Sequence, residues 1–284
     1  MKIQKAVITA AGRNQRHLPL QTLVDREGFP RSALNLLIEE ITSAGIQDIG
    51  IVIAPGDRDL FQECVDVSNA NLTFIVQKEP RGYGHAIHCA KDFLDGSAFL
   101  LMVSDHLYVS DASASCARQL VETAENLDCS ISAVQPTHEG KLTDFGAVGG
   151  TLSNEGKSLY AIEKILEKPT PTQAEQDLHV PGLRTGHYLC FFGMHILTPR
   201  ILSILEELLE KKKATPSLSD ALQELTDQEQ YLASVIRGRR YDLEHRYGML
   251  TAQMALALDG RHREEVLTQL VELLAESRHG QKEG

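Results

Sequence analysis

The stretch KAVITAAGRNQRHLPLQTLVDREGFP (Lys5–Pro30) decides the fold of this 284-residue chain. It begins with a short apolar run, Lys5–Ala11, which passes into a long polar loop that contains glycine. The next segment, Ser32–Ser43, repeats apolar residues at i, i+3, i+4 and i+7 from Leu34, which is the pattern of one buried helix face. The stretch therefore predicts a strand, a long loop and a helix, the first βα unit of an α/β fold.

The same alternation continues outward from this unit. Ile49–Ala54, Leu72–Val76 and Ala98–Val103 are further apolar runs, and His85–Leu94 has a helical pattern. After about residue 128 the strand-like runs follow one another without a helix between each pair, which predicts an inserted or antiparallel portion of the same sheet. We expect a Rossmann-like α/β fold, with a mixed, mainly parallel sheet flanked by helices and a helical C-terminus.

No strong boundary divides the chain. We expect one α/β domain over residues 1–260, followed by a C-terminal helix and frayed tail over residues 261–284. The segment Glu264–Glu276 predicts a helix that docks on another surface, because one face carries Val266, Leu267, Leu270, Val271 and Leu274.

Composition excludes several classes of protein. Lys plus Arg total 28 against 39 Asp plus Glu, a net charge of −11, so the chain lacks the basic footprint that binds nucleic acid or anionic membranes. No apolar run approaches the roughly 18 residues of a membrane span, and the short apolar start does not predict a signal peptide. The five cysteines have no CxxC spacing and predict reduced thiols. We therefore expect a cytoplasmic protein.

The loop Gly12–Pro30 is the strongest candidate for a ligand site. Its backbone amides and its three arginines, Arg13, Arg16 and Arg26, would suit phosphates. An ordinary surface loop with solvated arginines is the alternative, although so long a loop after a first strand favours function.

This loop resembles the signature of the sugar-1-phosphate nucleotidyltransferases, A-G-x-G-T-R-x-L-P followed by P-K-x-x-L-P. Five residues match its first part: Ala11, Gly12, Arg16, Leu18 and Pro19. Three departures stand out, because Asn14 and Gln15 replace a glycine and a threonine, and Arg26 occupies the lysine position. About three residues of the family pattern are also missing before the helix.

The resemblance continues along the chain at matching intervals and implies a division of roles. Gln77-Lys-Glu-Pro-Arg-Gly82-Tyr-Gly-His-Ala is similar to the family segment that reads a pyrimidine base. Asp105 after its apolar strand, and Asp242 six residues before Gly248, resemble the two aspartates that hold Mg²⁺. Without the resemblance, Asp105 could be a helix cap and Asp242 a surface partner of neighbouring arginines.

The sugar-phosphate end is implied by two further motifs. Phe145-Gly146 resembles the pair beside the sugar, and Glu167-Lys168-Pro169 resembles E-K-P, whose Glu binds sugar hydroxyls and whose Lys meets the phosphate. An asparagine expected in the sugar pocket is Tyr188 here, which bears on the identity of the sugar. A tripeptide such as E-K-P is by itself most often a surface turn.

The family resemblance implies transfer of a nucleotidyl group from an NTP to a sugar 1-phosphate with release of pyrophosphate. The most similar members use UTP and glucose 1-phosphate, with Mg²⁺ as cofactor. In these roles Arg16 and Arg26 are the candidate catalytic residues, and Ala11, Gly12, Arg13, Gln77 and Gly82 the nucleotide-binding ones. Gly146, Glu167 and Lys168 would bind the sugar phosphate, and Asp105 and Asp242 the metal.

Two alternatives stay open at this point, and a third is disfavoured. The chain could be a thymidylyl- or other nucleotidyltransferase with a different sugar phosphate, or a non-catalytic nucleotide-sugar-binding regulatory protein. An NAD-dependent Rossmann enzyme is disfavoured because Gly12–Arg16 lacks G-x-G-x-x-G. Assembly into a homo-oligomer is also left open.

Overall fold

The computed structural model describes residues 1–13, 16–66, 68–156, 158–211 and 217–279. Two of the departures noted in the sequence, Asn14 and Gln15, lie outside the described residues, as does the tail over residues 280–284.

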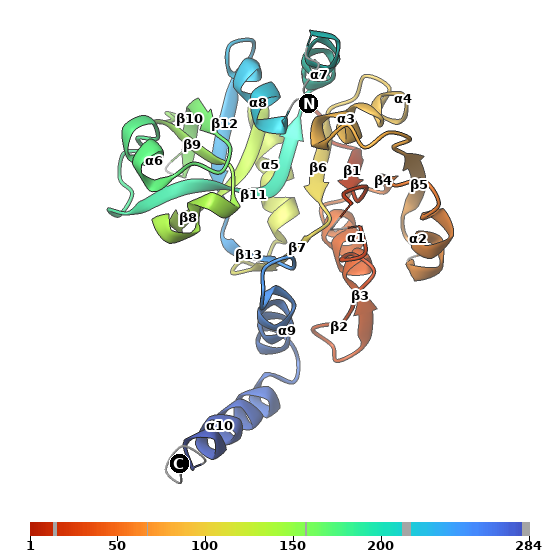
Figure 1. Cartoon of the computed structure of the whole chain (residues 1–284), viewed down its shortest axis with the longest axis vertical. Helices are drawn as coiled ribbons and strands as arrows, with labels where there is room; N and C mark the ends of the chain where they lie inside the picture. The colour runs from red at the N-terminus through yellow and green to blue at the C-terminus, as the bar shows by residue number, and fades with distance from the viewer. Residues whose placement is uncertain (14–15, 67, 157, 212–216, 280–284) are drawn as a thin grey trace.

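A nine-stranded sheet in the order β5-β4-β1-β6-β11-β8-β12-β10-β9 runs through the molecule (Figure 1). Its first four strands are all parallel, as the βα alternation predicted. They are β1 (Lys5–Thr9), β4 (Asp48–Ile53), β5 (Asn71–Val76) and β6 (Phe99–Val103). The first apolar run is thus a strand, and it lies at the interior of the sheet between β4 and β6.

The second half of the sheet is mostly antiparallel, which confirms the expected change of rhythm after residue 128. β11 pairs antiparallel with β6 and with β8, and only β12 pairs parallel, with β8. These strands are β8 (Ser130–His138), β9 (Ala147–Leu152), β10 (Leu159–Leu166), β11 (His187–Leu197) and β12 (Tyr231–Val235). The fold is therefore a mixed α/β sheet whose parallel part lies in the N-terminal half.

Helices cover both faces of the sheet and give it two large cores. On one face lie α1 (Ala33–Ser43) and α5 (Cys116–Leu127), and on the other α3 (Tyr83–His88), α7 (Arg200–Lys211) and α8 (Leu218–Thr226). Burial on both faces explains why the central strands are apolar runs rather than alternating ones. The shorter helices are α2 (Arg58–Cys64), α4 (Lys91–Leu94), α6 (Pro171–Asp177) and the 3-10 turn η1 (Glu139–Asp144).

The second half of the loop Gly12–Pro30 is a β-hairpin. β2 (Thr22–Val24) pairs antiparallel with β3 (Pro30–Ser32). Across the turn, the Asp25 side chain accepts hydrogen bonds from the backbone N–H groups of Glu27 and Phe29. Ser32 then caps α1 by accepting the N–H of Asn35 at 3.1 Å. The stretch predicted as one phosphate loop is therefore a shorter loop followed by a hairpin.

A separate two-stranded ribbon crosses the end of the main sheet. β7 (His106–Ser110) follows β6 after only two residues and pairs antiparallel with β13 (Gly238–Asp242). In this register Asp242 lies opposite His106, and the backbone N–H of Leu243 donates to the Asp105 carbonyl at 2.7 Å. The ribbon thereby brings two distant aspartates together.

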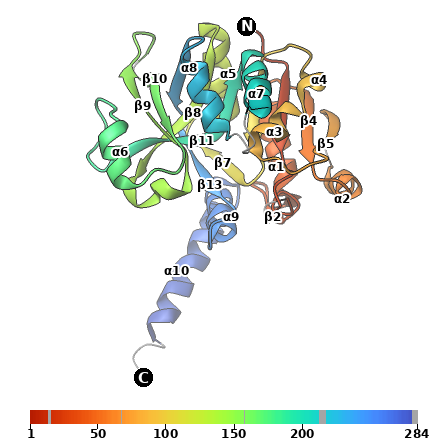
Figure 2. The same cartoon turned by 45° about the horizontal axis from the view of Figure 1, so that its top comes forward.

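The chain ends in α9 (Gly248–Asp259) and α10 (Arg263–His279), and α10 leads away from the rest of the molecule (Figures 1 and 2). Its first apolar residues, Val266 and Leu267, are half-buried, but Val271 and Leu274 on the same face are 64% and 66% exposed. Within the single chain the second half of this face is therefore not covered, and the docking expected from the sequence stays a prediction.

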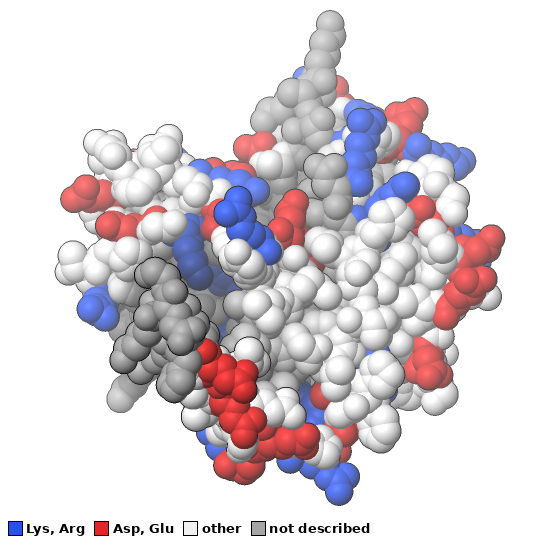
Figure 3. All heavy atoms as spheres, turned by 60° about the horizontal axis from the view of Figure 1, so that its bottom comes forward, with Lys and Arg blue, Asp and Glu red and all other residues white. Residues whose placement is uncertain are grey.

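The surface agrees with the acidic composition. On the face drawn in Figure 3, Lys and Arg lie scattered among Asp and Glu and do not gather into a continuous basic patch. Among the described residues, none of the helices has the length and apolarity that crossing a membrane requires.

Candidate active site

A cavity of about 830 Å³ opens where β1, β5, β6 and β11 end or bend. Its size is in the range of small-molecule sites, and the carboxyl ends of parallel strands are where α/β sheets bind ligands. The ten predicted site residues that line it come from separate parts of the chain: Ala11, Gly12, Arg13, Gln77, Gly82, Asp105, Gly146, Glu167, Lys168 and Asp242. The fold therefore assembles most of the predicted site around one space.

In the wall of the cavity the side chain of Gln77 is held in a fixed orientation. Gln77 follows β5, is 5% exposed, and donates from Nε2 to the Gly82 carbonyl at 3.1 Å. The same Nε2 lies 3.0 Å from Nδ1 of His85, which does not itself line the cavity. Gly82 has φ +91°, a conformation that favours glycine. His85 thus supports Gln77, and the amide is pre-oriented for a ligand.

Two aspartates that are distant in the sequence also line the cavity. Asp105 follows β6 and its Oδ1 lies 2.7 Å from Nδ1 of His106, while Asp242 ends β13 and accepts the Glu244 N–H at 2.8 Å. Burial alone would raise the pKa of Asp105, but the adjacent His106 and the more distant Lys168 outweigh it and hold the pKa below its usual value. The Asp105 carboxyl is therefore ionised.

The fit of this pair to a divalent metal can be judged from its donor set. Among the described residues no group of three or more His, Cys, Asp or Glu side chains is placed to hold a metal ion. Mg²⁺ bound with substrate needs only one or two carboxylates, since phosphate oxygens and water supply the rest. Two carboxylates that line one cavity, one directly before β7 and one at the end of its partner strand β13, fit that requirement.

A third part of the cavity wall contains Gly146, Glu167 and Lys168. A Cβ on Gly146 would lie 2.9 Å from the Phe191 ring and 3.1 Å from Glu167 Oε2, so only glycine leaves this wall open. The Glu167 carboxylate accepts a hydrogen bond from Ser219 at the start of α8. Lys168 has φ +47°, an uncommon conformation for a residue other than glycine. This part of the wall offers an oriented carboxylate next to an ammonium group.

The two candidate catalytic arginines lie outside this cavity. Arg16 is directed to Asp57, the residue before α2, with 3.5 Å between Nη1 and Oδ1. Arg26 is in the β2–β3 turn and pairs with Asp259 at the end of α9, with 2.7 Å between Nε and Oδ2. The sequence placed both in the catalytic centre, but the structure does not bring them to the other ten residues.

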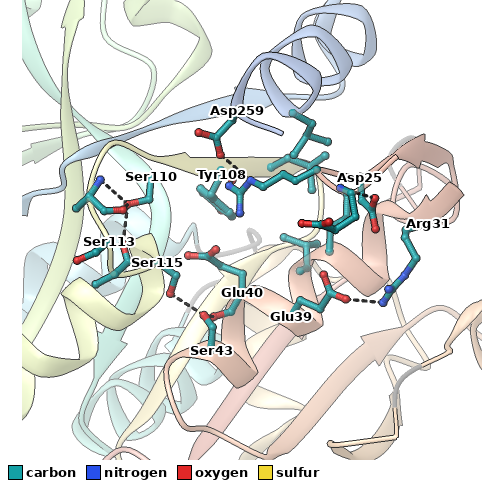
Figure 4. A pocket seen from close by; sticks show the side chains of 18 of the residues that line it. Asp25, Arg31, Glu39, Glu40, Ser43, Tyr108, Ser110, Ser113, Ser115 and Asp259 are labelled. Carbon is teal, nitrogen blue, oxygen red and sulfur yellow. Dashed lines mark hydrogen bonds and ion pairs between the residues drawn. The ribbon is translucent and has the colours of Figure 1, made fainter. Parts of the chain in front are cut away.

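Arg26 instead lines a second cavity of about 640 Å³ between the hairpin, α1, β7 and α9 (Figure 4). Figure 4 shows Glu40, Tyr108 and Asp259 facing this space. Burial raises the pKa of Glu40, although a hydrogen bond from the Ala117 N–H and the charge of Arg26 oppose the rise. The guanidinium also donates to the Tyr108 carbonyl at 3.4 Å. Arg26 is thus part of a charged contact behind the β7–β13 ribbon.

The structure adds residues that the sequence did not single out. His106, His195, Tyr83 and Glu244 line the main cavity. A signal for His106 existed, since it directly follows a candidate metal aspartate at the end of an apolar strand. Tyr188, which stands at the position of an expected sugar-pocket asparagine, packs against the small core near η1 and does not line the cavity.

Comparison with known proteins shows the family to which this chain belongs. The profile of the family described as Nucleotidyl transferase matches residues 5–253, nearly the whole α/β part of the chain. This chain belongs to the nucleotidyl transferase family, as the motifs implied.

Individual relatives narrow the comparison. The chain is 28% identical to the UTP–glucose-1-phosphate uridylyltransferase of Bacillus subtilis (strain 168), over 95% of this chain and 97% of that protein. It is 29% identical to the enzyme of the same name from Streptococcus pneumoniae serotype 4, over 90% and 91%. A crystal structure of UDP-glucose pyrophosphorylase complexed with UDP-glucose superposes with a TM-score of 0.74 at 25% identity, covering 89% of this chain and 98% of that one.

Proposed function

We propose that this protein transfers the uridylyl group of UTP to glucose 1-phosphate, forming UDP-glucose and pyrophosphate, with Mg²⁺ as cofactor. The observation that carries the proposal is the single cavity lined by ten residues whose types and order match those of sugar-1-phosphate nucleotidyltransferases. The relatives that match over nearly the whole chain bear the name of this activity.

The uracil base of UTP would bind next to the Gln77 side chain. Because Nε2 of Gln77 is committed to the Gly82 carbonyl, the amide presents its oxygen as an acceptor. The N3–H of uracil is a donor of matching kind, and the backbone at Gly82 would contribute the complementary polar groups. Ala11, Gly12 and Arg13, at the end of β1, would face the triphosphate.

The chemical step needs positioning and charge neutralisation more than it needs a protein nucleophile. A phosphate oxygen of glucose 1-phosphate attacks the α-phosphorus of UTP, the bond between the α-phosphorus and its bridging oxygen breaks, and pyrophosphate leaves. Asp105 and Asp242 would hold a Mg²⁺ ion, which neutralises charge on the two phosphates as they approach. Lys168 would orient the sugar phosphate, and Glu167, fixed by Ser219, would accept hydrogen bonds from sugar hydroxyls.

The roles of the two arginines are narrower in this proposal. Arg13 and Lys168 are the Lys and Arg side chains among the described residues that line the cavity. We therefore assign the phosphate contacts to them first, and propose that Arg16 supports the loop through Asp57. We also expect a cytoplasmic location, where UTP is formed and where free cysteines such as Cys116 and Cys190 stay reduced.

The test is a substrate matrix. The purified chain is incubated with Mg²⁺, each of the four common NTPs plus dTTP, and several sugar 1-phosphates, and pyrophosphate release is measured. We expect the highest rate with UTP and glucose 1-phosphate. A higher rate with dTTP or another sugar phosphate would replace the substrate assignment, and no release from any pair would favour a non-catalytic nucleotide-sugar-binding protein.

A further inference from the structure

The guanidinium of Arg240 lies over the ring of Phe145, a residue of the wall of the main cavity. Arg240 is on β13, two residues before Asp242, and its Cζ is 3.8 Å from the centroid of the Phe145 ring. Phe145 lines the cavity beside Gly146 and contacts His106 edge-on, with 6.1 Å between ring centroids. Only one aromatic ring therefore separates the Arg240 charge from the space where the substrate would bind.

This cation is poorly satisfied. Its Nη2 donates a long hydrogen bond of 3.4 Å to the Thr137 hydroxyl, while Nε and Nη1 are inaccessible to solvent and have no hydrogen-bond partner among the described residues. Burying an unpaired charge costs stability, so folding alone does not explain this arginine.

The excess of carboxylates in the cavity lining gives a functional reason for Arg240 to be present. Among the described lining residues are five carboxylates but only two Lys or Arg side chains, Arg13 and Lys168. Two of those carboxylates, Asp144 and Asp242, are the ones whose charges act on Arg240. A site that must accept two phosphorylated substrates needs positive charge, and in a low-dielectric wall such a charge acts through several ångströms.

We propose that Arg240 is a positioning residue of the sugar-phosphate subsite, with two linked effects. Its planar guanidinium holds Phe145, and with it the Gly146 wall, in place by stacking. Its charge offsets the carboxylates on the cavity side and so favours binding of the sugar phosphate. This inference rests on the proposed function, because it presupposes that the cavity binds a sugar 1-phosphate.

The two effects are separated by three substitutions of Arg240. Arg240→Gln keeps a planar group for stacking and removes the charge, Arg240→Met keeps bulk alone, and Arg240→Lys keeps the charge without the planar face. Arg239→Gln is the matched control, since it makes the same change in net charge at the neighbouring, exposed position of β13. Each variant is assayed for kcat, for KM of glucose 1-phosphate and of UTP, and for Tm.

We expect Arg240→Gln to raise the KM of glucose 1-phosphate about tenfold while its Tm is unchanged or higher, because an uncompensated buried charge is removed. Arg240→Met should raise this KM further, and Arg240→Lys should recover part of the loss. The Arg239→Gln variant should match the wild type in all three constants.

Three results would overturn the inference. In the first, both Arg240→Gln and Arg240→Met fail to fold. In the second, the Arg240 variants fold with a lowered Tm but with kcat and both KM values unchanged, and in the third, Arg239→Gln raises the KM of glucose 1-phosphate as much as Arg240→Gln does. Each would leave the proposed function standing, because that is judged from the wild-type rate in the same assay. A wild-type chain without pyrophosphate release would instead remove the proposed function and this inference together.

Discussion

Arg26 and Asp259 form an ion pair, with 2.7 Å between Nε and Oδ2, that fastens the β2–β3 turn to the last residue of α9. The contact is extended by the backbone, since the N–H of Arg261 donates to the Arg26 carbonyl at 2.7 Å. Gln253 on α9 adds two hydrogen bonds to the backbone of Val24. The hairpin thus holds the start of the C-terminal helical segment, and its arginine lines the second cavity and not the candidate active site.

We therefore expect Arg26→Ala to change stability slightly and catalysis little. Both side chains of the pair are more than a third exposed, at 43% and 38%, so the pair contributes at most about 1 kcal/mol. In a chain of this size that lowers Tm by roughly 2 °C. The measurement is Tm with kcat/KM for UTP, which should stay within about threefold of the wild type.

Asp259→Ala is the control for the Arg26 substitution, because it breaks the same ion pair from the other side. Similarly small changes in Tm and in kcat/KM in both variants would agree with an ion pair that only holds the β2–β3 turn against α9. A fall of a hundredfold or more in kcat for Arg26→Ala alone would instead support the catalytic role that the sequence motif implied, through a hairpin conformation different from this one.

The position of Arg26 illustrates what the sequence could and could not predict. The apolar runs predict β1, β4 and β6, because a strand that is buried on both faces consists mainly of apolar residues. Polar residues at the ends of such neighbouring strands then meet in one cavity. Asp105 and Gln77 were predictable for that reason. The path of the loop after Gly12 was not, since spacing along a chain does not determine its direction. A hairpin signal was nonetheless present in Asp25 and Gly28 at the turn and in the single buried residue of β2, Leu23.

The C-terminal helix was harder to predict for a different reason. A stripe of valines and leucines indicates that a face is apolar, but it does not indicate what covers it. Val271 lies on that stripe and is 64% exposed in the single chain. We expect deletion of residues 263–284 to leave a folded enzyme with a Tm within about 4 °C of the full chain, because α10 packs chiefly on α9. Aggregation of the truncated protein during purification would contradict this and would show α10 to be part of the folding unit.

The aspartate pair gives the sharpest test of the proposed chemistry. Asp105→Asn and Asp242→Asn should each lower kcat by at least about a hundredfold at saturating Mg²⁺, because each removes a carboxylate from the proposed metal site. Tm should change little, since neither residue belongs to the apolar core. Asp111→Asn, on the exposed continuation of β7, is the control for the loss of one negative charge near this ribbon. Turnover within tenfold of the wild type in both site variants would remove the metal assignment.

The Glu167–Ser219 contact predicts a graded effect on one substrate only. Glu167→Gln should raise the KM of glucose 1-phosphate about tenfold, since the amide is a weaker acceptor for sugar hydroxyls than a carboxylate. Ser219→Ala should raise it about threefold, because Glu167 then loses the hydrogen bond that orients it. The KM of UTP should stay constant in both, because the proposed function assigns the base to Gln77 and Gly82 and the triphosphate to Ala11, Gly12 and Arg13 rather than to Glu167. Equal increases for both substrates would place Glu167 elsewhere in the reaction.

His195 should make the protein's stability depend on pH in mildly acid solution. It is 3% exposed, lies on β11 with its Nδ1 against the Ser132 hydroxyl, and packs edge-on against Phe191. Burial lowers the pKa of His195 from 6.5 to about 3 in the folded chain. As pH falls below about 6.5 the unfolded state therefore takes up a proton that the folded state does not. The stabilisation is complete above that pH and is lost progressively down to about pH 3.

The expected loss through this histidine between pH 7 and pH 5 is about 2 kcal/mol in the free energy of unfolding. It is measured by urea unfolding of the wild type and of His195→Gln at several pH values, because glutamine does not titrate and its amide can still form a hydrogen bond with the Ser132 hydroxyl. The variant should be less stable at pH 7 and should show the smaller decline toward pH 5. His17→Gln, at an exposed position, should decline in parallel with the wild type. Parallel curves for His195→Gln and the wild type would mean that His195 is protonated in the folded protein at pH 5, and that the pocket around it opens to water.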